Sequence, residues 1–157
     1  MARKSNNLAL NKIVDLTNST LMDNQITKAV TFAVGTTGSL YGHPIATITG
    51  LCALQCFATC STDVGIRHGA TISVGTENSN AGLIAATSGT AIDAYEIWYA
   101  DITPVASIAK TGTGFPVYIT TGTGISYYVA TETVASGVVT FYIRWSPISG
   151  DGLVTAV

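Results

Sequence analysis

Three cysteines, Cys52, Cys56 and Cys60, are the side chains in this sequence best suited to metal chemistry. In a β-strand each residue advances the chain by about 3.3 Å, so the outer two would lie about 26 Å apart, too far to share one ion. The alternative for residues 51–59 is a helix. There, cysteines four residues apart would be separated by a rise of about 6 Å, and neighbouring thiols could bind the same metal ion. Structural zinc sites usually use closer pairs with partners elsewhere. We therefore predict a strand, no metal, and thiols that pack as small apolar groups.

The other candidates for catalysis are two histidines, His43 and His68, and the acidic residues Asp93 and Glu96. The sequence has no G-x-S-x-G nucleophile elbow to accompany the histidines. Residues 93 and 96 of a strand point to opposite faces, so their carboxylates would not act as a pair. Lys110 precedes a Thr-Gly-Thr-Gly run, whereas a phosphate-binding loop places its lysine after the glycines. We therefore predict that the protein is not an enzyme and holds no cofactor.

The composition is typical of a β-protein that is covered by partners. The chain has 157 residues, of which 24 are threonine, 16 are glycine and only 10% are charged. Threonine favours strands because its branched Cβ suits a pleated surface. Ordinary soluble proteins carry about 25% charged residues. A surface this poor in charge favours self-association, and we expect a homo-oligomer.

The first 27 residues differ from the rest, with five asparagines and neither glycine nor aromatic residues. A short amphipathic pattern in them stops at Thr17. We interpret residues 1–27 as an arm that becomes ordered against a neighbouring subunit, followed by one domain over residues 28–157. The candidate contact residues of the arm are Arg3, Lys4, Leu10, Lys12, Ile13, Val14 and Leu16.

Charge is unevenly divided between the arm and the body. Residues 1–28 hold four basic and two acidic residues, whereas the remaining 129 hold three basic and seven acidic ones. Four basic residues are few compared with nucleic-acid-binding tails, so we expect no nucleic-acid partner.

Neither a signal peptide nor a membrane span is predicted. No apolar core follows the basic start of the chain. Residues 29–62 carry no formal charge, but glycines, His43, Pro44 and Gln55 interrupt the run. We expect the chain to be made and assembled in a cytoplasm, without a membrane partner.

After the arm, β signals recur at intervals near ten residues. The expected strands are 28–34, 45–60 with a bulge or bend at Gly50, 71–74, 83–87, 91–100 (a strand throughout or a strand with a lead-in turn), 105–109, 111–119, 121–129 and 137–146. The two segments 111–119 and 121–129 echo each other and suggest a meander. The tail, residues 147–157, would add an edge strand or reach another subunit. About eight short strands predict an all-β fold, either a β-sandwich or a jelly-roll-like barrel.

Several tyrosines could form a binding surface for a sugar or another subunit. They are Tyr118, Tyr127, Tyr128 and Tyr142. Because alternate residues of a strand point inward, we expect about half of them to lie in the core.

Residues 70–98, ATISVGTENSNAGLIAATSGTAIDAYEIW, resemble a segment of small β-rich virion proteins of tailed bacteriophages, the head decoration or cement proteins. The similarity lies in the ATxSVG start, the AGLIAAT middle and the IDAxEIW end. It covers about thirty residues directly and extends to the rest only through the plan of an arm and a β-body.

The resemblance implies a structural protein without catalytic residues that binds the outer face of an icosahedral capsid and stabilises it, often as a trimer. Its partners would be the major capsid protein and further copies of itself, and it would reside on the virion surface after assembly in the host cytoplasm. Besides the arm, the apolar loops within residues 76–90, with Leu83 and Ile84, are expected to contact the capsid. The alternative is a tail, fibre or neck component, with the tyrosines of residues 118–142 binding a host glycan.

Overall fold

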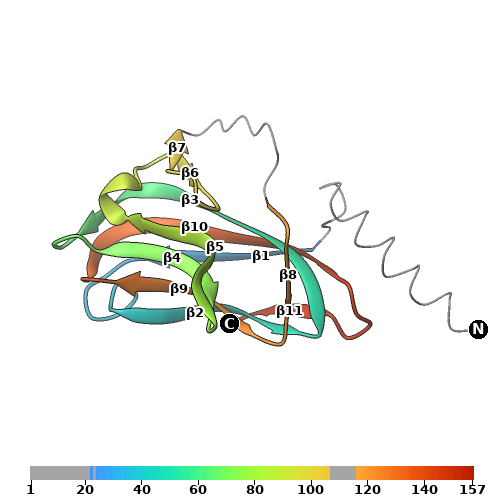
Figure 1. Ribbon diagram of the computed structural model, residues 1–157. Coiled ribbons are helices and arrows are strands. Elements are labelled where there is room, and N and C mark those ends of the chain that lie inside the picture. The colour runs from blue at the N-terminus through green and yellow to red at the C-terminus, as the bar shows by residue number, and fades with distance from the viewer. Residues whose placement is uncertain (1–21, 23, 107–115) are drawn as a thin grey trace, which may run out of the picture.

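A computed structural model describes residues 22, 24–106 and 116–157. Figure 1 shows two antiparallel sheets stacked face to face, which confirms the predicted all-β class and the sandwich architecture. The arm residues predicted to make contacts (Arg3, Lys4, Leu10, Lys12, Ile13, Val14 and Leu16) lie outside the described residues, as does Lys110.

Each sheet is built from strands that are distant in sequence. Sheet A has the order β1-β10-β3-β6-β7, with β8 also paired to β3, and sheet B has the order β11-β2-β9-β4-β5. The strands of sheet A are β1 (Asn24–Thr31), β3 (Leu51–Ile66), β6 (Glu96–Trp98), β7 (Val105–Ala106), β8 (Tyr118–Thr121) and β10 (Val134–Pro147). Those of sheet B are β2 (Tyr41–Thr49), β4 (Thr71–Thr76), β5 (Ser79–Ser88), β9 (Gly124–Ala130) and β11 (Leu153–Ala156). One 3₁₀ turn, η1 (Gly89–Ala91), follows β5.

The strand order is that of a jelly roll. Its eight main strands, in chain order, are β1, β2, β3, β4, β5, β8, β9 and β10. Counted from first to eighth, they are arranged 1-8-3-6 in sheet A and 2-7-4-5 in sheet B. This interleaving of two Greek keys defines the double-sheet jelly roll. The short strands β6 and β7 are an insertion between the fifth and sixth main strands, and β11 adds an edge to sheet B.

Alternation along β10 shows how the sequence specifies the buried face. Val139, Phe141, Ile143 and Trp145 all point into the core, as their spacing predicts. The residues between them are half-buried on the outer face. Because β10 lies between β1 and β3, it forms hydrogen-bonded ladders on both sides.

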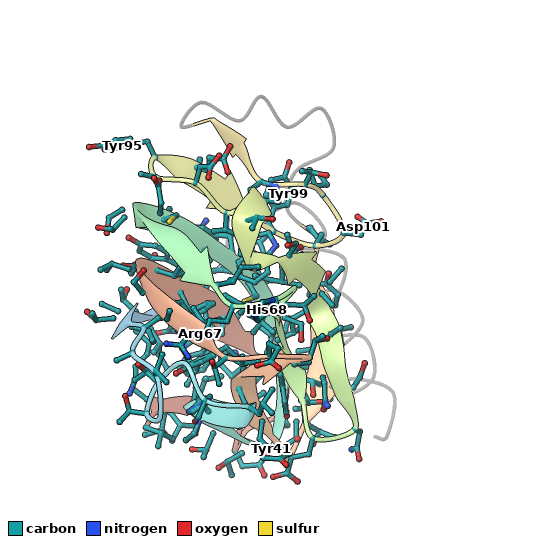
Figure 2. The ribbon with its side chains drawn as sticks, turned by 90° about the vertical axis from the view of Figure 1, so that its left-hand side faces the viewer. Tyr41, Arg67, His68, Tyr95, Tyr99 and Asp101 are labelled. Atoms are coloured by element: carbon teal, nitrogen blue, oxygen red, sulfur yellow. The ribbon has the colours of Figure 1, made fainter. Side chains whose placement is uncertain are left out.

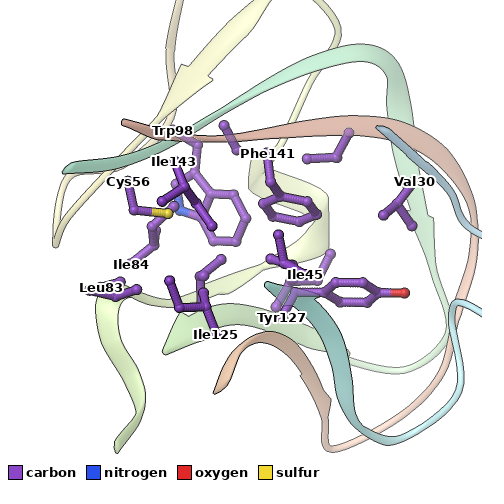
Figure 3. Close-up of a cluster of buried hydrophobic side chains, with 14 of the residues drawn as sticks. Val30, Ile45, Cys56, Leu83, Ile84, Trp98, Ile125, Tyr127, Phe141 and Ile143 are labelled. Atoms are coloured by element: carbon purple, nitrogen blue, oxygen red, sulfur yellow. The ribbon is translucent and has the colours of Figure 1, made fainter. Parts of the chain in front are cut away.

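Three aromatic rings connect the sheets at the centre of the core (Figure 3). Tyr127 of sheet B stacks on Phe141 of sheet A, with ring centroids 5.4 Å apart, and Trp98 lies 6.4 Å from Phe141. The polar atoms are satisfied, because Trp98 Nε1 donates to Thr87 Oγ1 at 3.0 Å and Tyr127 Oη donates to the Thr37 carbonyl at 2.9 Å. These aromatic side chains therefore bury a large apolar area without an unpaired polar group.

The apolar run 45–60 crosses from one sheet to the other. Gly50, with a φ of +62°, separates β2 in sheet B from β3 in sheet A. A glycine tolerates this left-handed backbone because it has no Cβ. The predicted bend at Gly50 is thus confirmed, and residues 51–59 form a strand rather than the alternative helix.

One expectation about strand pairing is wrong. Residues 118–121 and 124–130 do not form a meander, because β8 pairs with β3 in sheet A whereas β9 pairs with β2 and β4 in sheet B. Residues 91–100 take the alternative form, a strand with a lead-in turn: the turn precedes β6 (Glu96–Trp98), and Ala100 forms an isolated parallel bridge with Ile84.

The sandwich begins before residue 28, the first residue of the predicted domain. β1 begins at Asn24 and pairs with β10 over its whole length, so residues 24–27 belong to the sandwich. The tail forms β11, which pairs with β2 as an edge strand of sheet B.

The aromatic core yields a test of the fold. Replacing Phe141 with Ala should lower the free energy of unfolding by about 3–5 kcal/mol, because it opens a cavity between the two sheets. Tyr142→Ala, the adjacent change on the outer face of the same strand, should cost about 1 kcal/mol. Urea titration followed by tryptophan fluorescence measures both values. Equal losses for the two variants would contradict the assigned core.

Candidate functional site at the loop end of the sandwich

Four connections meet at one end of the jelly roll. They are residues 32–40, 67–70, 89–95 and 131–133, and we call this region the loop end. The antiparallel registers bring them together, since Thr71 is opposite both Ser88 and Ala130. Figure 2 looks onto this end, with Arg67 and His68 near its centre, Tyr95 near the top and Tyr41 at the bottom.

Backbone hydrogen bonds join the four connections to one another. The Val134 amide donates to the Gly38 carbonyl at 2.9 Å, and the Arg67 amide donates to the Thr133 carbonyl at 3.2 Å. The Gly89 amide likewise donates to the Ala70 carbonyl at 3.0 Å. The loop end is therefore a set of mutually braced loops rather than four independent ones.

Left-handed backbone conformations at non-glycine residues are concentrated at the loop end. Positive φ angles occur at Tyr41 (+91°), His68 (+44°), Tyr95 (+69°) and Thr131 (+72°), one in or beside each connection. Such conformations cost about 1–3 kcal/mol each and persist where the surroundings impose them. The loop end also contains the left-handed glycines Gly35 and Gly69, but at the opposite end the left-handed residues in the turns after β2 and β8 are both glycines, Gly50 and Gly122. The loop end thus holds conformational strain that the opposite end avoids.

The strain at Tyr41 has a visible consequence. Tyr41 pairs with Val129, whose side chain lies in the core, so a regular strand would direct the tyrosine to the same inner side. Instead the backbone turns at a φ of +91°, and the side chain is 81% exposed. The strained backbone therefore presents an aromatic ring to the exterior.

Tyr95 is held outward by a tight local network. Its amide donates to the Cys60 carbonyl at 2.8 Å, while its side chain is 76% exposed. The preceding amide, that of Ala94, donates to Asp63 Oδ1 at 2.7 Å, and the Asp93 amide donates to Glu96 Oε2 at 3.0 Å. The carboxylates of Asp63 and Glu96 therefore accept hydrogen bonds from the turn that carries Tyr95.

Exposed apolar side chains accompany the two tyrosines. Val34 and Leu40 lie in the first connection and are also exposed. Arg67 and His68 form the centre of the loop end. Three of the connections also carry one charged residue each, Arg67, Asp93 and Glu132. Exposed aromatic and aliphatic side chains on braced loops are suited to binding a ligand or a partner by contact.

Leu83 and Ile84 do not lie where a capsid contact requires. Both are buried in the core, with exposed fractions of 5% and 0%, because β5 places Ile84 opposite Val74 of β4. Figure 3 shows them among the core side chains. The expectation that these two side chains contact a partner is therefore wrong.

The predicted surface tyrosines divide as expected between core and surface. Tyr127 is buried, whereas Tyr118, Tyr128 and Tyr142 are half-buried. Tyr118 Oη donates to the Leu83 carbonyl at 3.1 Å, and Tyr142 stacks on Phe57 with centroids 4.8 Å apart. Sequence reasoning missed Tyr41 and Tyr95, because nothing in the sequence around a tyrosine marks a left-handed backbone.

The three cysteines are buried and free, as predicted. Within the part of the chain that the structure describes, no three His, Cys, Asp or Glu side chains come close enough together to hold a metal ion. Burial raises the pKa of the Cys56 thiol to about 12. This thiol therefore stays protonated and apolar in the folded protein.

No helix among the described residues is long and apolar enough to cross a membrane. Comparisons with protein-family models, curated proteins and solved structures yield no match to this chain. The function is therefore argued from the geometry of the chain itself.

Gly38 tests the bracing of the loop end. A Cβ at this position would overlap the Val134 carbonyl oxygen, so Gly38→Ala should separate the first and fourth connections and destabilise the protein by about 1–3 kcal/mol. The matched control is Gly150→Ala, where a Cβ meets nothing within 4 Å. Thermal unfolding of both variants measures the difference. An unchanged Gly38→Ala protein would show that the connections are not coupled.

Cys56 predicts a specific dependence of stability on pH. Burial raises the pKa of its thiol from 9.0 to about 12, so the folded protein keeps a proton that the unfolded chain releases. The resulting stabilisation is fully present below pH 9.0 and is lost as the pH rises toward 12. The stability advantage of wild type over Cys56→Ala should therefore shrink as the pH rises from 9.0 toward about 12 in chemical denaturation. A constant difference would contradict the burial of the thiol.

Proposed function

We propose that this protein is a structural component of a tailed-bacteriophage virion that binds the outer face of the capsid and stabilises it. In this proposal the partner is the major capsid protein, the protein acts as a homo-oligomer, with a trimer as the expected form, and it carries out no catalysis. It is made in the host cytoplasm and resides on the virion surface.

The observation that carries the proposal is a jelly-roll body in which the loop end and the entry of the chain lie at opposite ends. Jelly rolls serve as capsid and lectin domains, so the fold agrees with a virion role but does not by itself assign one. The particular support is that the chain enters the sandwich at the end opposite the loop end. Asn24 is opposite Trp145 at one end of the ladder, whereas Thr31 is opposite Val138 at the other.

The entry point is anchored in the body. Met22 is only 2% exposed and packs with Ala53 in a small cluster beside the main core. Arg144 Nη2 donates to the Met22 carbonyl at 3.0 Å. A load applied to the chain before residue 22 would therefore be transferred to β10 at the centre of sheet A.

This arrangement suits an arm that binds the shell and a body that faces outward. The basic and apolar residues Arg3, Lys4, Leu10, Lys12, Ile13, Val14 and Leu16 are the proposed capsid contacts. The loop end, on the opposite side of the body, then points away from the capsid.

A tail, fibre or neck component is the second candidate. The observation that favours it is the pair of highly exposed tyrosines at the loop end, Tyr41 and Tyr95, since an exposed aromatic ring on a rigid loop is suited to receptor contact. Copy number separates the two functions, because a capsid protein repeats over the shell whereas a tail or neck protein is present in few copies.

The test combines copy number with removal of the arm. Quantitative mass spectrometry of purified particles should give a simple fixed ratio of this protein to the major capsid protein. A variant lacking residues 1–20, which leaves Met22 and β1 in place, should keep the circular dichroism and thermal unfolding of the sandwich but bind purified shells at least tenfold more weakly. A few copies per particle would favour the tail or neck, and undiminished binding by the truncated chain would overturn the role of the arm.

A further inference from the structure

A hollow of about 320 Å³ lies beside the loop end on the outer face of sheet B. Leu40 and Tyr41 form one wall, Asn80 forms another, and the end of β9 from Tyr128 to Ala130, with Thr131 just after it, supplies the rest. From its shape and chemistry, we propose that this hollow is a binding site for a neutral hexose, such as the terminal sugar of a surface glycan.

An irregularity in β5 builds the Asn80 wall. Thr76 pairs with Ser79 and Val74 pairs with Ile84, so the segment between Ser79 and Ile84 bulges out of the regular ladder. Gly75 permits this fold, since a Cβ there would overlap the Ser79 carbonyl oxygen. Ser73 Oγ then donates to the Asn80 carbonyl at 2.9 Å and fixes the bulge against sheet B.

A second glycine positions the Tyr128 ring. Tyr128 is opposite Gly42 on the neighbouring strand, and a Cβ at Gly42 would lie 2.7 Å from Cε1 of the tyrosine. The ring therefore occupies the space above the glycine and offers an apolar face to the hollow.

Tyr41, the first residue of β2 and next to the first connection, completes the site. Its φ of +91° turns the ring away from the core and leaves it 81% exposed beside the same hollow. The fourth connection contributes Thr131, which also has a left-handed backbone and is exposed. Two strained residues in or beside different connections thus border one cavity, a pattern that marks functional sites.

The lining selects the class of ligand. It contains two phenols, one carboxamide and one threonine hydroxyl, and none of its residues is charged. Apolar rings bind the C–H face of a pyranose, while neutral donors and acceptors at the rim pair with its hydroxyls. A volume near the lower limit of small-molecule sites suits one sugar ring rather than an extended peptide. A neutral hexose meets all three conditions.

Saturation-transfer NMR tests the site with the methyl glycosides of glucose, galactose, mannose and N-acetylglucosamine. At least one should receive saturation from the full-length protein, with an affinity in the millimolar range. Tyr41→Ala and Gly42→Ala should each weaken that binding by about tenfold, the first by removing a ring and the second by displacing Tyr128. Tyr95→Ala, which removes an equally exposed tyrosine outside the hollow, should bind like wild type.

Two results would overturn the proposal. The first is the absence of transfer to all four glycosides. The second is binding that Tyr41→Ala and Gly42→Ala leave unchanged while circular dichroism shows both to be folded. Concentration-dependent self-association that Tyr41→Ala abolishes, without sugar binding, would assign the hollow to a second copy instead.

The outcome is independent of the capsid proposal. The chain lacking residues 1–20 should bind the sugar normally, and Tyr41→Ala should attach to shells normally. Failure of one proposal therefore leaves the other standing.

Discussion

The structure depends on burying the inner faces of two sheets against each other. Tyr127 and Phe141 come from opposite sheets and stack at 5.4 Å in the middle of that interface. Because nearly every connection between main strands crosses from one sheet to the other, the chain is free to vary only where it turns, at the two ends of the sandwich. The core therefore determines the fold, and the conformations of the turns can differ between the two ends.

The two ends differ in which residues adopt left-handed backbone conformations. At one, turns such as those at Gly50 and Gly122 use glycine, which adopts a left-handed backbone at little cost. At the other, Tyr41 and Tyr95 adopt such backbones at a cost that only tertiary contacts can offset. The strained residues Tyr41 and Tyr95 direct their side chains outward. We regard this asymmetry as the strongest indication that the loop end is a binding surface.

Much of the fold can be predicted from the sequence, but little of the candidate site can. Alternation along β10 and the break at Gly50 were readable because burial and backbone conformation are local signals. The pairing of β8 with β3 could not be predicted, because the residues of a strand do not indicate which distant strand it pairs with. The burial of Leu83 and Ile84 could not be predicted, because it depends on the irregular pairing of β5, which places Ile84 opposite Val74 of β4. Tyr41 was missed since its exposure results from a single dihedral angle.

The pairing of β1 has a mechanical consequence. All eight residues from Asn24 to Thr31 pair with β10, and the chain enters at the Asn24 end, just after Met22. Tension on the preceding chain acts along the strand axis and loads the hydrogen bonds of this ladder together, in shear, rather than breaking them one after another. Forced detachment is then limited by the rate at which the whole ladder ruptures. A short strand paired along its whole length with β10, an inner strand of sheet A, would therefore serve as a tether that withstands pulling.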